Sequence, residues 1–232
     1  MITILLPAYN EEDVIEKSIS TISSELNIKE DYEILVINDG SKDKTEEILT
    51  QLTQKYSKLR YVSHEINKGL GAAIRTGFQK AKGRIIIELD ADLTQPIKHV
   101  PQMIEKIDQG YDLCIASRYL NGGGMRNVPN WRVWLSKAAN SVFSIIYLTK
   151  TTDLTSGYRA YRYSFIKNLD LKQDGFAIQL EISVMMAKYK ARITEIPFIL
   201  TNRSIGHSKF SFAKVLPKYL PVIIKLFFIR FF

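Results

Sequence analysis

The sequence predicts a three-layer α/β domain built on a mostly parallel β-sheet. Short runs of apolar, β-branched residues indicate buried strands, and they alternate with segments whose apolar residues recur at helical spacing. Such alternation is typical of a parallel sheet with helices on both faces. With 232 residues, 46% of them hydrophobic, the chain is long enough to bury the core of one large domain.

Five strands are predicted in the first half of the chain. They cover residues 2–8, 34–37, 59–63, 84–89 and 112–116. The segments between them show helical periodicity, around residues 14–26, 48–52, 67–77 and 100–107. The segment 67–77 is punctuated by glycines and rich in small residues, so it predicts a turn followed by a helix that packs closely on the sheet.

The second half of the chain is less regular. A long helix is predicted from Trp131 to about Tyr147, and another over residues 177–190. Residues 193–200 predict a strand that Pro197 interrupts. Because proline cannot donate a hydrogen bond to a neighbouring strand, this strand is expected at an edge of the sheet.

The composition limits the classes of partner. A net charge of +8 indicates an anionic partner, such as nucleotide phosphates, nucleic acid or an anionic membrane surface. No aromatic and basic platform or recognition motif favours nucleic acid. Cys114 is the only cysteine and has apolar neighbours, which predicts a buried thiol and excludes an intrachain disulfide. No stretch reaches the roughly 20 apolar residues of a membrane-spanning helix.

The fourth predicted strand ends in two carboxylates, Asp90 and Asp92, separated by one residue. Ligands of open α/β sheets bind beyond the carboxyl ends of the strands, so these side chains lie where a site is expected. Together they can hold a hard divalent cation such as Mg²⁺ or Mn²⁺, with a diphosphate supplying further oxygens. The alternative is a polar turn that closes the strand, because so short a pattern also occurs without a metal.

Polar residues also follow other predicted strands: Glu11 the first, Asp39 the second and Ser117-Arg118-Tyr119 the fifth. With these residues the chain resembles the family 2 glycosyltransferases of the GT-A fold, which is Rossmann-like, and within them the dolichyl and polyprenyl phosphate mannose and glucose synthases. The matching segments are residues 7–11, 38–41, 67–77, 90–92, 117–119, 153–159 and 203–209. The segments 153–159 and 203–209 point most narrowly to the lipid-phosphate enzymes.

The resemblance implies a nucleotide-sugar site and a metal site. The expected nucleotide-sugar residues are Pro7, Tyr9, Glu11, Ile37, Asp39, Asp90, Ala91, Asp92, Arg118, Arg203 and Lys209. The expected catalytic residues among them position the sugar or stabilise charge on the leaving diphosphate, and they are Asp90, Asp92, Arg118 and Arg203. The expected metal ligands are Asp92 and Thr94. Relatives often have glutamine in place of Thr94, and here Gln95 follows one residue later.

The resemblance also implies an acceptor site for a lipid phosphate at Arg132 and Ser136. Residues four apart share one face of a helix, so both side chains can reach one anion. Trp131 and Trp134 suit a membrane interface, where an apolar ring with a polar edge is favoured. An ordinary core-packing helix is the alternative for this segment.

The last part of the chain is expected to form a separate element. Residues 1–209 form the expected catalytic domain, and residues 210–232 carry apolar residues at near-helical spacing, interspersed with lysine and arginine. Pro217 and Pro221 interrupt this spacing. We therefore expect amphipathic helices that lie in a membrane interface. Some relatives continue into transmembrane helices after such a segment.

The reaction that the resemblance implies is an inverting transfer of a hexose to dolichyl or polyprenyl phosphate at the cytoplasmic face of a membrane. Mannose from GDP-mannose is the favoured donor sugar, and a membrane subunit is an expected partner. The acceptor phosphate is already ionised, so it needs no general base. Three alternatives stay open: UDP-glucose as the donor, a glycan hydroxyl as the acceptor with Asp153 or Glu181 as the base, and a non-catalytic nucleotide-sugar-binding subunit.

Overall fold

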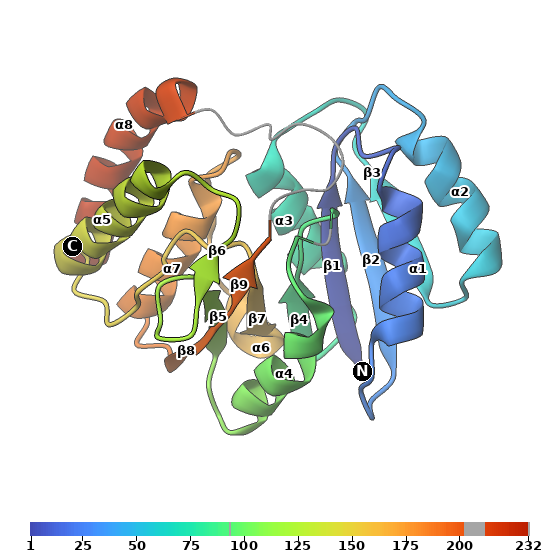
Figure 1. The fold of residues 1–232 in the computed structure, drawn as a ribbon, viewed down its shortest axis with the longest axis horizontal. Coiled ribbons are helices and arrows are strands. Elements are labelled where there is room, and N and C mark those ends of the chain that lie inside the picture. Colours follow the sequence, from blue (N-terminus) through green and yellow to red (C-terminus); the bar gives the residue numbers. More distant parts are fainter. Residues whose placement is uncertain (93, 202–211, 232) are drawn as a thin grey trace.

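The computed structural model describes residues 1–92, 94–201 and 212–231, and the side chains of residues 212–220 are outside this description. A seven-stranded sheet forms its centre, in the order β3-β2-β1-β4-β7-β5-β8 (Figure 1). Its strands are β1 (Ile2–Ala8), β2 (Tyr32–Asn38), β3 (Leu59–Ser63), β4 (Ile85–Glu88), β5 (Leu113–Ser117), β7 (Arg159–Arg162) and β8 (Ile193–Pro197). Neighbouring strands run parallel, except that β7 is antiparallel to both β4 and β5.

Helices cover both faces of this sheet, which confirms the predicted three layers. On one face α1 (Ile15–Glu25), α2 (Thr45–Lys55) and α4 (Val100–Asp108) share a buried apolar cluster with the strands. On the other face α3 (Leu70–Lys80), α6 (Tyr163–Ile166) and α7 (Ile178–Lys188) contribute to a second cluster. The small residues of α3 let it approach closely, because a Cβ at Gly77 would overlap the buried side chain of Leu5.

The predicted strands are present, and β8 lies at the sheet edge as Pro197 indicated. Cys114 is fully buried, as predicted. Strand β7 was not predicted, because four residues after a polar loop carry too little periodicity. Since β7 is antiparallel, its first residue pairs beside the carboxyl ends of β4 and β5. The loop before β7 is therefore held at the edge of the sheet where a ligand is expected to bind.

A further group of elements lies beside the sheet, at the end of the molecule away from α1 and α2 (Figure 1). The short strands β6 (Gly124–Met125) and β9 (Ile199–Leu200) pair in a small parallel sheet. Helices α5 (Asn130–Ile146) and α8 (Phe212–Phe231) pack with α7. The buried residues that join them are Tyr147, Leu154, Leu180, Val184 and Leu226.

The C-terminal segment differs from the prediction of interrupted helices. Residues 212–231 form one continuous α-helix through Pro217 and Pro221. The two prolines are four residues apart, so the N–H groups they lack lie on one side of the helix. The helix also contacts the rest of the domain, since the Tyr147 hydroxyl donates to the Ile223 carbonyl at 3.0 Å. Across the described ranges, no helix combines the length and the apolar character that crossing a bilayer requires.

Candidate active site

A cavity of about 730 Å³ lies at the carboxyl ends of the sheet strands. It is lined by ten of the residues predicted from the sequence: Pro7, Tyr9, Glu11, Asp39, Asp90, Ala91, Asp92, Thr94, Arg118 and Ser136. They come from the ends of β1, β2, β4 and β5 and from α5, segments that lie far apart in the sequence. The sheet thus brings these predicted residues around one space.

Ile37 and Arg132 do not line this cavity. The Ile37 side chain is fully buried in the cluster between the sheet and α3, so the predicted role of Ile37 at the nucleotide stays a prediction for its backbone alone. Arg132 is exposed near the start of α5, and its guanidinium lies 5.2 Å from the ring centroid of Trp131. Arg203 and Lys209 are outside the described residues.

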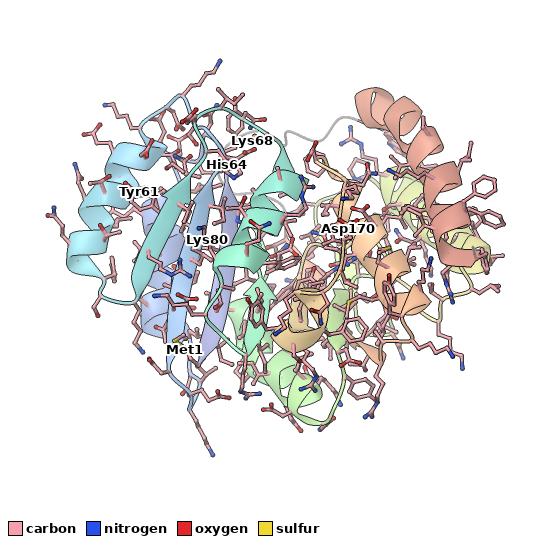
Figure 2. All side chains as sticks on the ribbon, turned by 180° about the vertical axis from the view of Figure 1, so that it is seen from behind. Met1, Tyr61, His64, Lys68, Lys80 and Asp170 are labelled. Atoms are coloured by element: carbon pink, nitrogen blue, oxygen red, sulfur yellow. The ribbon has the colours of Figure 1, made fainter. Side chains whose placement is uncertain are left out.

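Asp39 follows β2 and organises the turn that leads into α3. Its carboxylate accepts hydrogen bonds from the backbone N–H groups of Lys68 at 3.0 Å and Gly69 at 2.8 Å. One of its oxygens also lies 2.6 Å from Nδ1 of His64. Figure 2 shows His64 and Lys68 at the end of the sheet opposite Met1, which is the end where β1 and β2 lead into the cavity. These contacts orient the Asp39 carboxylate within the protein itself.

Asp90 and Asp92 lie just beyond β4, and the turn that follows orients both carboxylates. Gln95 binds Asp90 twice: its Nε2 donates to Oδ2 at 2.7 Å, and its Oε1 accepts from the Asp90 N–H at 2.8 Å. Asp92 Oδ1 accepts from the backbone N–H of Thr94 at 3.1 Å. Gln95 is therefore turned inward to hold Asp90, a role that the sequence analysis missed. The one sign of this turn in the sequence was Thr94, at a position where relatives often have glutamine, with Gln95 one residue later.

The oxygens of Asp90 and Asp92 fit a hard divalent cation that shares its coordination with a diphosphate. Such cations prefer carboxylate oxygens as protein ligands. Within residues 1–92, 94–201 and 212–231, no group of three or more His, Cys, Asp or Glu side chains could hold a metal by itself. A cation at this turn would therefore take part of its coordination from these carboxylates and the other oxygens from a bound diphosphate.

Glu88 lies under this turn and is buried two residues before Asp90. Its carboxylate accepts a hydrogen bond from the Tyr161 hydroxyl at 2.7 Å and another from the side-chain amide of Gln179. Burial raises the pKa of Glu88 to about 7, although the hydrogen bond from Tyr161 and the charge of Arg159 favour the ionised form. A group that titrates near neutral pH therefore lies directly beneath the cavity.

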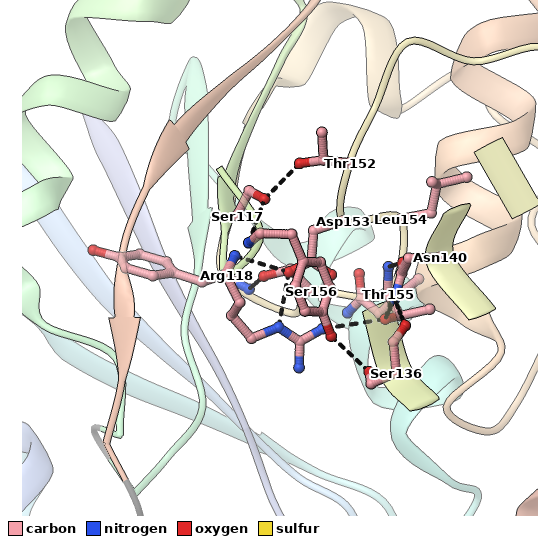
Figure 3. A network of polar contacts seen from close by, with 12 residues as sticks. Ser117, Arg118, Ser136, Asn140, Thr152, Asp153, Leu154, Thr155 and Ser156 are labelled. Atoms are coloured by element: carbon pink, nitrogen blue, oxygen red, sulfur yellow. Dashed lines mark hydrogen bonds and ion pairs between the residues drawn. The ribbon is translucent and has the colours of Figure 1, made fainter. Parts of the chain in front are cut away.

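Arg118 follows β5 and is paired with Asp153 in the network of Figure 3. Its Nε and Nη2 lie 2.8 and 2.7 Å from the two oxygens of the fully buried Asp153, and Nη2 also donates to the Thr155 hydroxyl at 3.2 Å. Burial alone would lower the pKa of Arg118, but the charge of Asp153 keeps that pKa raised. The guanidinium is thus fixed at the cavity wall, with Nη1 as the nitrogen through which it can bind a ligand.

The two carboxylates considered as general bases have structural partners. Asp153 pairs with Arg118, and Glu181 accepts hydrogen bonds from the backbone N–H groups of Lys172 and Gln173 at 2.8–3.1 Å. Asp153 and Glu181 are both buried, and neither lines the cavity. Both carboxylates thus have structural roles in the described part of the chain, and neither lies at the cavity wall.

A fully buried arginine that the sequence analysis left without a role holds the loop before β7. Arg159 donates to three backbone carbonyls: those of Ser156 and Leu154 at 2.6 Å and that of Gln179 at 3.0 Å. These bonds tie the loop to the first turn of α7. The motif at residues 153–159 thus shapes the site by positioning its backbone.

Helix α5 presents one face to the cavity. Four residues at the spacing of a single helical face line it: Ser136, Ala139, Asn140 and Phe143. The Tyr119 hydroxyl donates to the Ser136 hydroxyl at 2.6 Å, and Asn140 Nδ2 donates to the Thr155 hydroxyl at 3.1 Å (Figure 3). Burial raises the pKa of Tyr119, so its hydroxyl keeps the proton that it donates. Ser136 is thereby held within the same network as Arg118.

Comparison with known proteins shows the family to which this sequence belongs. The model of glycosyl transferase family 2 matches residues 3–170. The chain is 35% identical over 228 residues to the dolichol-phosphate mannosyltransferase of Pyrococcus furiosus, across 97% of this chain and 63% of that protein. It is 31% identical over 215 residues to the polyprenol monophosphomannose synthase of Mycolicibacterium smegmatis, across 90% of this chain and 80% of that protein. The chain thus spans less than two thirds of the length of the Pyrococcus relative.

Solved structures share the fold. Glucosyl-3-phosphoglycerate synthase from Mycobacterium tuberculosis, in complex with Mn²⁺, uridine-diphosphate-glucose and phosphoglyceric acid, matches with a TM-score of 0.73 at 21% identity. The match covers 99% of this chain and 79% of that one. At this identity the likeness concerns the fold, whereas the family model and the two relatives establish the family. This chain belongs to glycosyl transferase family 2, and it has the α/β fold with a mostly parallel sheet that is typical of GT-A proteins.

Proposed function

We propose that this enzyme transfers a hexose from a nucleotide sugar to the phosphate of a polyprenyl lipid, with GDP-mannose as the favoured donor and dolichyl or another polyprenyl phosphate as the acceptor. One observation carries the proposal: a single cavity joins the carboxylates at the strand ends to a face of α5, a helix that also exposes two tryptophans. The names of the two relatives, a dolichol-phosphate mannosyltransferase and a polyprenol monophosphomannose synthase, support it.

On the donor side, Tyr9, Glu11 and Asp39 line the part of the cavity where we place the nucleoside. An aromatic ring can pack on a base, and carboxylates accept hydrogen bonds from base and ribose. Asp92, together with Thr94, would hold a Mg²⁺ or Mn²⁺ ion, which supplies positive charge to the leaving diphosphate. The structural relative from Mycobacterium tuberculosis was solved with Mn²⁺ and a nucleotide sugar, which supports a divalent metal.

Arg118 adds a fixed positive charge beside the diphosphate. Because Asp153 already orients the guanidinium, Nη1 can bind a phosphate oxygen with little further loss of side-chain freedom. The geometry therefore suits stabilisation of the charge that develops as the diphosphate leaves. We propose that Arg203 and Lys209, outside the described residues, add further positive charge.

On the acceptor side, an oxygen of the lipid phosphate attacks the anomeric carbon while the bond from that carbon to the diphosphate breaks, which inverts the configuration. The attacking phosphate is already ionised, so no residue has to remove a proton. The structural roles of Asp153 and Glu181 support this acceptor over a hydroxyl that would need one of them as the base. Ser136 in the cavity and Arg132 at the exposed start of α5 are the proposed phosphate contacts.

An exposed apolar surface lies next to the acceptor wall, which is our name for the cavity side of α5. We define the α5–α8 surface by the exposed apolar residues of the two helices: Trp131, Trp134, Leu135, Val142, Ile145, Ile224, Phe227, Phe228 and Phe231. Extended apolar surfaces mark sites of contact with membranes or proteins, and aromatic rings interspersed with basic residues suit a lipid interface. We therefore propose that the α5–α8 surface lies on the cytoplasmic leaflet that holds the acceptor lipid.

Transfer of labelled sugar into a lipid tests the proposal. The protein is incubated with labelled GDP-mannose or, separately, UDP-glucose, in the presence of Mg²⁺ or Mn²⁺, with and without dolichyl phosphate in detergent. We expect label in the lipid phase from GDP-mannose. Label from UDP-glucose would correct the donor, and transfer to a glycan without lipid would overturn the proposed acceptor. Donor binding without transfer to any acceptor would contradict catalysis by this chain alone and favour a requirement for a partner subunit.

A further inference from the structure

Gln179, in the first turn of α7, presents a buried oxygen without a hydrogen-bond partner. The residue is 4% exposed and lines the cavity. Among the described residues, its Oε1 is the one buried side-chain polar atom that has no partner. Buried acceptors without a donor are rare in native proteins because they cost free energy, so this oxygen points to a ligand that supplies a donor.

Neighbouring groups determine which way the Gln179 amide faces. Its Nε2 donates to Glu88 Oε1, and the other Glu88 oxygen accepts from Tyr161. Since Nε2 makes this bond, the amide has its NH₂ group toward Glu88 and its oxygen on the other side. The backbone is held too, because the Gln179 carbonyl accepts from Arg159 at 3.0 Å. The orientation of the Gln179 amide is therefore fixed by neighbouring residues.

The place beside this amide is kept open by Gly157. A Cβ on Gly157 would lie 3.6 Å from Gln179 Nε2, 3.7 Å from Asp90 Oδ1 and 3.9 Å from Glu88 Oε1. Gly157 does not have a positive φ, so its backbone conformation does not itself require glycine. Gly157, Asp90 and Gln179 all line the cavity. The missing side chain thus leaves a small polar recess next to the first carboxylate of the Asp90–Asp92 turn.

The chemistry of the recess selects the kind of group that can enter it. The Asp90 carboxylate and the Gln179 oxygen accept hydrogen bonds, and the Gln179 NH₂ group beside Gly157 has a second N–H to donate, so the recess suits a group that can both donate and accept. An ionised phosphate oxygen only accepts hydrogen bonds and would be repelled by the neighbouring Asp90 carboxylate, which disfavours the diphosphate at this position. Hydroxyl groups of a sugar can donate to both residues.

We propose that the recess between Gly157, Gln179 and Asp90 binds the hexose of the donor, with Gln179 Oε1 accepting a hydrogen bond from one hexose hydroxyl. This inference rests on the proposed function, in which the donor is a nucleotide sugar. It makes Gln179 a specificity-determining residue that distinguishes hexoses by the presence and orientation of that hydroxyl. A site built to bond one hydroxyl discriminates strongly against an analogue that lacks it.

Two variants test the recess in different ways. Gln179→Met keeps the length of the side chain and removes the acceptor, together with the amide N–H that donates to Glu88. Gly157→Ala fills the recess while leaving the hydrogen bonds in place, since the added Cβ would meet its neighbours only at ordinary contact distances. Gly124→Ala is the matched control, because a Cβ at Gly124 meets nothing within 4 Å and Gly124 does not line the cavity. Thermal unfolding of each variant establishes that it is folded.

The readout is equilibrium binding of the nucleoside diphosphate and of the nucleotide sugar, together with kcat/KM for transfer. For Gln179→Met and Gly157→Ala we expect unchanged affinity for the diphosphate and a loss of about tenfold or more for the sugar donor. Gly124→Ala should match the wild type in both. If both recess variants bind the sugar donor as tightly as the wild type does, the inference is overturned.

Deoxy analogues of the donor hexose identify the hydroxyl. For the wild type, kcat/KM with one of the deoxy donors should be about tenfold or more below kcat/KM with the normal donor. For Gln179→Met, the same deoxy donor should give no further decrease relative to the normal donor. If Gln179→Met lowers kcat/KM relative to the wild type by the same factor with every deoxy donor, the residue acts only through packing. That outcome overturns the inference but leaves the proposed function standing. A wild type that neither binds nor uses any nucleotide sugar would overturn both.

Discussion

In the proposed function the cavity has a donor wall and an acceptor wall, and the two are built differently. The donor wall is formed by Tyr9, Glu11, Asp39, Asp90, Asp92 and Arg118, and the acceptor wall is the cavity side of α5. In the donor wall, Asp39 and Asp90 each accept hydrogen bonds from neighbouring groups of the protein, and each follows a buried strand. In the acceptor wall, Asn140 is the one buried residue among the seventeen of α5, all of which the structure describes. The same helix exposes Trp131 and Trp134.

This difference indicates two ways of preparing a substrate site. Groups that the protein already orients lose little freedom when a ligand binds, so the donor wall is suited to the chemical step. An exposed apolar helix face is stabilised when a lipid surface removes it from water, so in the proposed function contact with a membrane would complete the acceptor wall. Changes in the donor wall should therefore slow transfer, whereas changes in the acceptor wall should weaken capture of the lipid.

The largest effect is expected in the donor wall, from Asp92→Ala. Loss of this carboxylate removes a proposed metal ligand beside the diphosphate, so transfer should fall about a hundredfold or more. The side chain is only half-buried, so the unfolding temperature should change little. Initial rates at saturating metal and calorimetry measure both. Asp170→Ala, at a carboxylate that does not line the cavity, should behave like the wild type. Unchanged turnover of Asp92→Ala would refute the metal assignment.

A smaller and more selective effect is expected from Arg132→Ala in the acceptor wall. Losing one charge-assisted bond to the lipid phosphate should raise KM for the lipid about tenfold while leaving KM for the donor unchanged. Lys137→Ala serves as the control, because Lys137 is an exposed cation of the same helix that does not line the cavity. Kinetics with each substrate varied in turn separate the two constants. An equal rise in both would show that Arg132 has no special relation to the acceptor.

Trp134→Ser addresses the membrane side of the acceptor wall. Trp134 is 72% exposed, so its replacement should weaken binding to anionic lipid vesicles about threefold or more and spare transfer to a short acceptor in detergent. Cosedimentation with vesicles measures the binding. Ile66→Ser is the matched control, since Ile66 is 69% exposed and lies outside the α5–α8 surface. If the two substitutions change vesicle binding equally, that surface does not face the membrane.

Glu88→Gln tests the raised pKa of the buried carboxylate beneath the donor wall, through the pH dependence of the free energy of unfolding. Burial raises the pKa of Glu88 from its ordinary value of 4.5 to about 7, so the folded state binds this proton more tightly than the unfolded state does. The free energy of unfolding of the wild type should therefore fall, relative to the variant, as pH rises from about 4.5 to about 7, by up to about 3 kcal/mol. Denaturant titrations at several pH values measure the difference. A difference that stays constant with pH would contradict the raised pKa.

Much of the donor wall was predictable because its pattern is local. Each of β1, β2 and β4 is an apolar run with polar residues shortly after it. Parallel strands end at one edge of a sheet, so the carboxylates Asp39, Asp90 and Asp92 had to converge. The partners of those carboxylates were harder to predict. Nothing in the local pattern shows that Gln95 turns back onto Asp90 or that His64 contacts Asp39, because such contacts depend on how the turns fold.

The sequence by itself therefore determined the layers, the parallel strands and which carboxylates meet, because apolar periodicity and strand direction are local properties. The tertiary structure decided the rest. The insertion of β7 between β4 and β5 places Asp153 against Arg118, 35 residues away in the sequence, and buries Arg159 under the loop. The order of strands in a sheet follows from the packing of the whole chain. The polar recess beside Asp90 exists only because that packing sets Gly157 and Gln179 next to it.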